Sequence, residues 1–136
     1  MKKTLCTVLA LLCLLTLASC GYASAYRAIG LVTMHNRSTY SVSFYDLKGT
    51  MSETLRLTTG EGELYYSATL EEGEVNVYYD IYGEKELLFT IKAGETVEGH
   101  GGYIESGCRI YIVIETVGSA QNGSIRVSTK PMEEEP

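Results

Sequence analysis

The chain has 136 residues, of which 45% are hydrophobic, and a formal net charge of −6. This length suits one domain with a single core. The excess of acidic residues argues against a nucleic-acid partner and against electrostatic adhesion to anionic lipid.

Residues 1–19 have the pattern of a secretory signal peptide. Lys2 and Lys3 supply a positive start, and the 13 residues 5–17 are apolar except for two threonines. A membrane-spanning helix needs about 20 apolar residues, so this run is too short to remain threaded in the bilayer. We therefore predict that the chain is exported and that this segment is removed.

The end of this segment, Leu17-Ala18-Ser19-Cys20, resembles the lipobox of bacterial lipoproteins. The resemblance implies cleavage between Ser19 and Cys20 and a diacylglyceryl group, with acyl chains such as palmitate, on the Cys20 sulfur. Two acyl chains anchor a protein stably, because each buried CH₂ contributes about 0.8 kcal/mol. The expected location is the extracytoplasmic face of the cell membrane. The alternative is an ordinary signal peptide with a chance cysteine at its boundary.

Cleavage before Cys20 would leave 117 residues with a net charge of −8, because two lysines leave with the signal. Cys6 and Cys13 leave as well, and lipid would block Cys20. Only Cys108 remains, so we expect no intramolecular disulfide. Cys108 opens an apolar strand and is predicted to be a small core residue.

Residues 20–38 show no clear period and are predicted to form the lipidated terminus and a tether. From Thr39, apolar and polar residues alternate with period two, which is typical of antiparallel strands. No convincing helix follows. The predicted strands are 39–47, 51–58, 63–70, 75–82, 86–92, 95–98, 109–117 and 123–129.

Seven or eight short strands favour an all-β fold, an antiparallel β-sandwich, over residues 39–130. The strand at 109–117 is apolar on both faces, so we expect it to be central in its sheet. A small β-barrel is the alternative fold. Residues 131–136 are acidic and are predicted to be a disordered tail.

Two hairpins can be placed in register. The first turns at Glu71–Glu74 and forms the apolar pairs Leu70 with Val75, Ala68 with Val77, Tyr66 with Tyr79 and Leu64 with Ile81. A slip of one residue would put these sets out of step. The second has Gly83 in its loop and forms the pairs Ile81 with Leu87, Tyr79 with Phe89 and Val77 with Ile91.

The first register sorts the tyrosines onto two faces. Tyr66 and Tyr79 point inward, whereas Tyr65, Tyr78 and Tyr82 point outward on neighbouring strands. Exposed tyrosines can stack on sugars or form a protein contact surface, which makes the outward three the candidate ligand contacts. Alternatively, another strand or sheet covers this face, or tyrosine is present because it suits strands.

The spacing of turn glycines and core residues over about 39–129 resembles a group of small secreted bacterial lipoproteins. The residues that carry the resemblance are Phe44 to Gly49, Leu55 to Leu57, Glu72 to Val77, Gly102-Tyr103, Tyr111 to Ile114 and Gly123 to Val127. The resemblance implies a β-sandwich-like strand pattern and no particular activity.

No residue pattern predicts a catalytic, metal or cofactor site. A general base or a metal site would need one of the two histidines, His35 or His100, beside carboxylates. His100 lies in a glycine-rich segment, 98–102, that is predicted to be a loop without a phosphate-binding motif. The densest acidic cluster, Glu71–Glu74, is predicted to be a solvated turn.

Three functional hypotheses follow. The first is a membrane-anchored surface lipoprotein that serves as a non-catalytic binding or interaction module, attached through Cys20, with a protein or glycan as its ligand. The second is a carbohydrate-binding module that uses an exposed tyrosine face. The third is a small envelope enzyme, in which His100 would lie in a pocket beside Glu98, Glu105 or another carboxylate.

Overall fold

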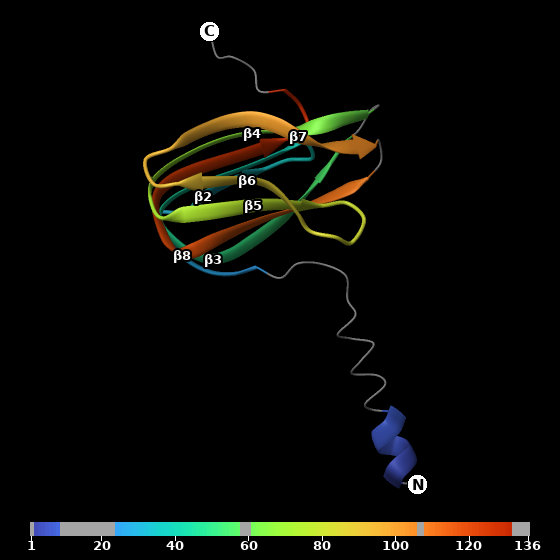
Figure 1. The fold of residues 1–136 in the computed structure, drawn as a ribbon. Helices are drawn as coiled ribbons and strands as arrows, with labels where there is room; N and C mark the ends of the chain where they lie inside the picture. The colour runs from blue at the N-terminus through green and yellow to red at the C-terminus, as the bar shows by residue number, and fades with distance from the viewer. Residues whose placement is uncertain (1, 9–23, 58–60, 106–107, 132–136) are drawn as a thin grey trace.

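Antiparallel strands make up most of the chain (Figure 1). The structure, a computed structural model, describes residues 2–8, 24–57, 61–105 and 108–131. The strands are β1 Ala25–Ile29, β2 Val32–His35, β3 Thr39–Arg56, β4 Glu61–Glu72, β5 Glu74–Asp80, β6 Glu86–Lys92, β7 Thr96–Glu105 and β8 Arg109–Ser128. Residues 2–8 form a short helix. Within the described ranges, no helix has the length and apolar character that crossing a membrane requires.

The strands form two packed layers. The long strands β3 and β8 contribute to both layers. β8 pairs with β5 along its first half and with β4 along its second half, while β3 runs antiparallel beside it. One layer therefore has the order β6-β5-β8-β3, and the other has the order β7-β4-β8-β3-β2. β1 continues the edge formed by β2 and pairs with β3 at its bend. The described strands do not close into a barrel. The predicted antiparallel β-sandwich is confirmed, and β8 is central in it, as expected.

The two long strands bend where they pass from one layer to the other. The register of β3 against β8 shifts between Lys48 and Thr50. Gly49 and Gly118 lie at the bend with φ of 124° and 71°, which favour glycine. The Thr116 hydroxyl accepts a hydrogen bond from the Gly49 N–H at 2.8 Å and donates one to the Gly118 carbonyl at 2.7 Å. These bonds satisfy backbone groups that the bend takes out of the ladder.

The predicted hairpin between β4 and β5 is wrong. The two strands lie in different layers, and both pair with β8. The chain bends between them at Gly73, whose φ is 96°. A Cβ at this glycine would lie 2.5 Å from the Ser119 carbonyl oxygen and 2.7 Å from the Ala120 Cα, so the bend is packed directly on β8. The bend leaves Leu70 and Val75 facing the core, which the hairpin would also have done.

The second predicted hairpin, between β5 and β6, is confirmed as a pairing but differs in register. Val77 lies opposite Phe89 instead of Ile91, and a β-bulge follows. Its loop contains Gly83, with φ of 99°, whose N–H donates to the buried Asp80 carboxylate at 2.7 Å. Asp80 thereby holds the end of β5 against the start of the loop.

The glycine-rich segment at 98–102, predicted to be a loop, is the middle of β7. The Tyr66 ring covers Gly99, where a Cβ would lie 2.8 Å from its hydroxyl oxygen. The same ring stacks on Phe89 of the other layer, with ring centroids 4.3 Å apart. The glycines therefore give large rings room to cross the interior.

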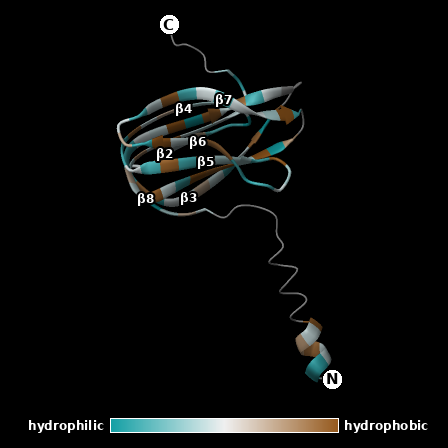
Figure 2. Ribbon diagram, in the orientation of Figure 1, coloured by the Kyte–Doolittle hydropathy of each residue, from teal (hydrophilic) through white to brown (hydrophobic). Residues whose placement is uncertain are grey.

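The core lies between the layers and comes from alternate residues of the strands, as the hydropathy colours show (Figure 2). Fully buried side chains include Leu47, Leu55, Leu64, Ile91, Ile104, Ile110, Ile112 and Ile114. Cys108 packs against this core while partly buried, which agrees with the structural role predicted for it.

β1 and β2 lie in the segment that was predicted to be a tether. β1 pairs with Asp46–Thr50 of β3 and β2 with Tyr40–Ser43, so together they form one edge strand interrupted at Gly30. The sandwich therefore begins at Ala25 and not at Thr39. Almost every residue of this edge strand is exposed, and so its sequence lacks the alternation that marks a half-buried strand.

Several predictions concern positions outside the described residues. Ser19 and Cys20, which carry the cleavage and lipidation predictions, belong to this group, as do residues 132–136 of the predicted tail. These remain predictions.

Candidate ligand-binding cleft

The structure does not bring the three predicted contact tyrosines into one stripe. Tyr65 lies on β4, opposite His100 of β7, whereas Tyr78 lies on β5 in the other layer. The Lys85 ammonium sits 4.4 Å from the centroid of the Tyr78 ring and covers it. Of the three, only Tyr82 is largely exposed, at 76%. The predicted stripe depended on pairing β4 with β5, and it fails with that pairing.

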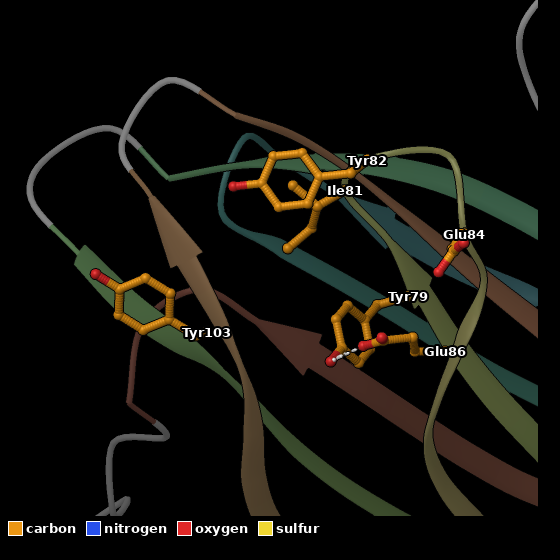
Figure 3. A pocket seen from close by; sticks show the side chains of 6 residues that line it. All are labelled: Tyr79, Ile81, Tyr82, Glu84, Glu86 and Tyr103. Atoms are coloured by element: carbon orange, nitrogen blue, oxygen red, sulfur yellow. Dashed lines mark hydrogen bonds between the residues drawn. The ribbon is translucent and has the colours of Figure 1, made fainter.

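Tyr82 instead lines a cleft together with two tyrosines that were not predicted as ligand contacts. Tyr79, Tyr82 and Tyr103 line a cleft of about 650 Å³ at one end of the sandwich, where the β5–β6 loop approaches β7 (Figure 3). The other described residues of its lining are Ile81, Glu84 and Glu86. This volume is within the range of about 300–1,000 Å³ typical of small-molecule sites.

Local backbone features position the three rings. Tyr79 ends the inward face of β5, and its ring lies against the backbone of Gly102 on β7, where a Cβ would be 3.0 Å from the ring. Gly102 has φ of 72° and is the extra residue of a β-bulge opposite β4. The next residue, Tyr103, is 60% exposed. Tyr82 is carried by the loop that Gly83 and Asp80 fix.

The polar groups of the cleft are phenols and carboxylates. The Tyr79 hydroxyl donates to Glu86 Oε2 at 2.6 Å (Figure 3). This hydrogen bond, with burial and the charge of Glu86, raises the pKa of Tyr79 to about 12. The negative charge of Glu105 is the main cause of a raised pKa for Tyr82. Both phenols therefore stay neutral at physiological pH and keep their protons for hydrogen bonding.

The lining determines which ligands the cleft can accept. Exposed aromatic faces offer apolar contact, and the Glu84 and Glu86 carboxylates accept hydrogen bonds. No lysine, arginine or histidine lines the cleft in the described part of the chain, so an anionic ligand would meet like charge. The cleft suits a small, hydroxyl-rich ligand with an apolar face.

The histidines lie elsewhere. His100 Nδ1 forms a close contact with Glu63 Oε2 of β4, and both side chains are largely exposed. The carboxylate beside His100 is therefore Glu63, which the enzyme hypothesis allows as a carboxylate other than Glu98 and Glu105. Glu98 and His100 also line one surface pocket, together with Tyr65, Gly99 and Pro131. His35 Nε2 lies 2.7 Å from the Thr54 carbonyl oxygen, on another edge of the sandwich. Among the described residues, no group of three or more histidine, cysteine, aspartate or glutamate side chains is placed to hold a metal ion.

Comparison with known proteins gives distant likenesses only. No protein-family model matches the chain, and no curated protein matches it. A ruminal GH26 endo-β-1,4-mannanase superposes with a TM-score of 0.42 and 11% identity over 68% of this chain, which spans 20% of that enzyme. A carbohydrate-binding module of family 29 superposes with a TM-score of 0.40 and 16% identity, over 78% of this chain and 75% of the module.

A third likeness is to TmCBM61, solved in complex with β-1,4-galactotriose. It has a TM-score of 0.38 and 15% identity, over 82% of this chain and 70% of that one. All three scores are below 0.5, so these likenesses carry no argument about what this chain binds.

Proposed function

We propose that this protein is a non-catalytic, glycan-binding module held on the extracytoplasmic face of a membrane by lipid on Cys20. The observation that carries the binding proposal is the cleft of Tyr79, Tyr82 and Tyr103. It combines exposed aromatic rings and carboxylates in a concave site of ligand size. Among the described residues, its lining contains no histidine, serine or cysteine.

A neutral sugar matches these groups better than other small ligands do. The C–H faces of a pyranose ring would pack on the exposed rings of Tyr82 and Tyr103. Its hydroxyls would donate to Glu84 and Glu86, and hydrogen bonds to charged acceptors are the stronger ones. Tyr79 would present a fixed ring to the ligand, because its hydroxyl donates a hydrogen bond to Glu86.

The anchor proposal is supported by the sequence alone. The positive start, the short apolar run and the small residues before Cys20 match the type of signal that directs lipid attachment. Anchoring would present the cleft to ligands outside the cell while keeping the module at the envelope.

The binding proposal is tested by titrating the purified mature protein with a panel of neutral oligosaccharides, using calorimetry. Tyr82→Ala and Tyr103→Ala should each weaken binding about ten-fold, since an aromatic contact contributes up to about 1.5 kcal/mol. Tyr45→Ala is the matched control, because the exposure of Tyr45, 69%, lies between those of Tyr82 and Tyr103 and because Tyr45 lies on β3, outside the cleft lining. It should bind as the wild type does.

Two results would overturn the glycan assignment. One is affinity for no neutral oligosaccharide in the panel, or affinity that Tyr82→Ala and Tyr103→Ala leave unchanged. The other is preferential binding of a quaternary ammonium compound, which would mean that the rings and carboxylates form a cation site.

The anchor is tested separately by the intact mass of the membrane-associated protein. A mass of residues 20–136 plus acyl chains is expected. Cys20→Ser should remain an uncleaved precursor without lipid, and a variant that still matured to the wild-type mass would refute lipidation at this residue.

A further inference from the structure

The edge strand formed by β1 and β2 carries an exposed apolar patch. Ile29, Val32, Met34 and Tyr45 are each between 62% and 71% exposed. The Tyr45 ring rests on the backbone of Gly30, between the end of β1 and the start of β2. We name these four residues the edge patch. Large exposed apolar groups gathered in one place mark an interaction surface more often than isolated ones do.

The side chains of the edge patch share the outer face of the sandwich. Val32 and Met34 lie opposite Ser43 and Ser41 of β3, whose neighbours in the chain face the core. Ile29 lies opposite Asp46 on the same outer side. The patch therefore points away from the core, and nothing in the described part of the chain covers it.

Basic residues flank the edge patch in an otherwise acidic protein. Residues 24–57 contain four lysines and arginines against two acidic residues, whereas residues 61–131 contain five against twelve. Arg27 and Lys48 lie opposite each other on β1 and β3, next to Ile29, and both are exposed. Among the described residues, neither makes an ion pair with a carboxylate. Residues 24–57 therefore carry a net charge of +2, whereas residues 61–131 carry −7.

Chain length places the same edge close to the proposed lipid. Five residue steps separate Cys20 from Ala25, the first residue of β1. Even a fully extended chain of this length reaches only about 18 Å. The lipid would therefore hold β1 within that distance of the bilayer surface, and no other element of the sandwich is tethered so closely.

We propose that the edge patch, with Arg27 and Lys48, docks on the surface of a bilayer containing anionic lipid. The inference rests on the proposed lipid anchor and adds an orientation to it. Apolar side chains would enter the interface while the two cations approach anionic headgroups. β6 and β7 lie at the opposite edges of the two layers, so this orientation turns the cleft away from the membrane and toward ligands.

The test uses the lipidated mature protein in vesicles of phosphatidylcholine and phosphatidylglycerol with brominated acyl chains. The protein has no tryptophan, so Met34→Trp provides a single reporter in the patch. Leu87→Trp is the matched control, because Leu87 is also apolar, is 55% exposed and lies on β6. Brominated lipid should quench emission from position 34 and leave emission from position 87 unchanged.

Charge is tested on the Met34→Trp background. Arg27→Gln with Lys48→Gln should shift the ratio of docked to undocked molecules about five-fold per cation removed, and so reduce the quenching. Lys92→Gln with Lys130→Gln removes the same charge from other parts of the surface and should have no such effect.

The outcomes separate this inference from the anchor on which it rests. A lipidated mass combined with equal quenching at positions 34 and 87 would overturn the orientation and leave the anchor intact. An unlipidated mass would overturn both. Blue-shifted emission from position 34 that needs no lipid and grows with protein concentration would mean that a second copy covers the edge, which also overturns the inference.

Discussion

The bend at Gly73 gives the sharpest test of the architecture. Alanine there would have to adopt φ near 96°, and its Cβ would lie 2.5 Å from one backbone atom of β8 and 2.7 Å from another. The left-handed conformation alone costs about 1–2 kcal/mol, part of which is offset by the lower entropy of the unfolded chain. Forcing the two backbone segments apart should lower the free energy of unfolding by a further amount of about 1–3 kcal/mol, in the range of other overpacking substitutions.

Gly94→Ala is the matched control for this substitution. Gly94 also has a positive φ, 79°, but a Cβ there would meet no atom within 4 Å. Urea unfolding followed by far-ultraviolet circular dichroism should therefore show Gly73→Ala to be less stable than Gly94→Ala. The slope of the unfolding free energy against urea concentration should be the same for both variants. Equal stabilities would refute the packed bend, because in an open hairpin turn Gly73 would be as unhindered as Gly94.

Other predictions follow from single contacts. Tyr79→Phe should lower the free energy of unfolding by about 1 kcal/mol below pH 10, because the phenol donates to a carboxylate. The folded-state pKa of Tyr79 is raised from 10.0 to about 12, so this contribution should be lost as the pH rises through that interval, and a difference from wild type that persisted above pH 12 would contradict the reasoning. Thr116→Val should cost about 1–2 kcal/mol in urea unfolding, because it leaves the Gly49 N–H and the Gly118 carbonyl without the hydroxyl. A neutral effect would mean that water replaces that hydroxyl.

The strand content was predictable from the sequence because alternation is set by burial of one face. β6 was predicted at its observed bounds, and the inward residues of β4 and β5 were assigned to the core. What alternation does not encode is the partner of each strand. A bend at Gly73 and a hairpin turn place Leu70 and Val75 on the same core, so only the long-range pairing with β8 distinguishes the two arrangements.

The candidate site was only partly predictable. Tyr82 was selected as exposed and does line the cleft, but Tyr103 follows a glycine segment that was predicted to be a loop. The sequence does place Tyr103 directly after two glycines, Gly101 and Gly102. The second of these is the extra residue of the β-bulge that precedes Tyr103. Tyr79 was assigned correctly to the inward face. That it also lines the cleft depends on where the strands of both layers end, which alternation does not predict.

Glycan binding in the cleft is tested by titrating the mature protein with a neutral oligosaccharide while following the nuclear magnetic resonance signals of labelled tyrosine rings. All 11 tyrosines lie after Cys20 and report on the whole domain. We predict that the ring signals of Tyr79, Tyr82 and Tyr103 shift together on binding, while those of Tyr45 and Tyr65 stay in place. Shifts confined to tyrosines outside the cleft, or no shifts at saturating sugar, would contradict the proposal that this cleft binds glycans.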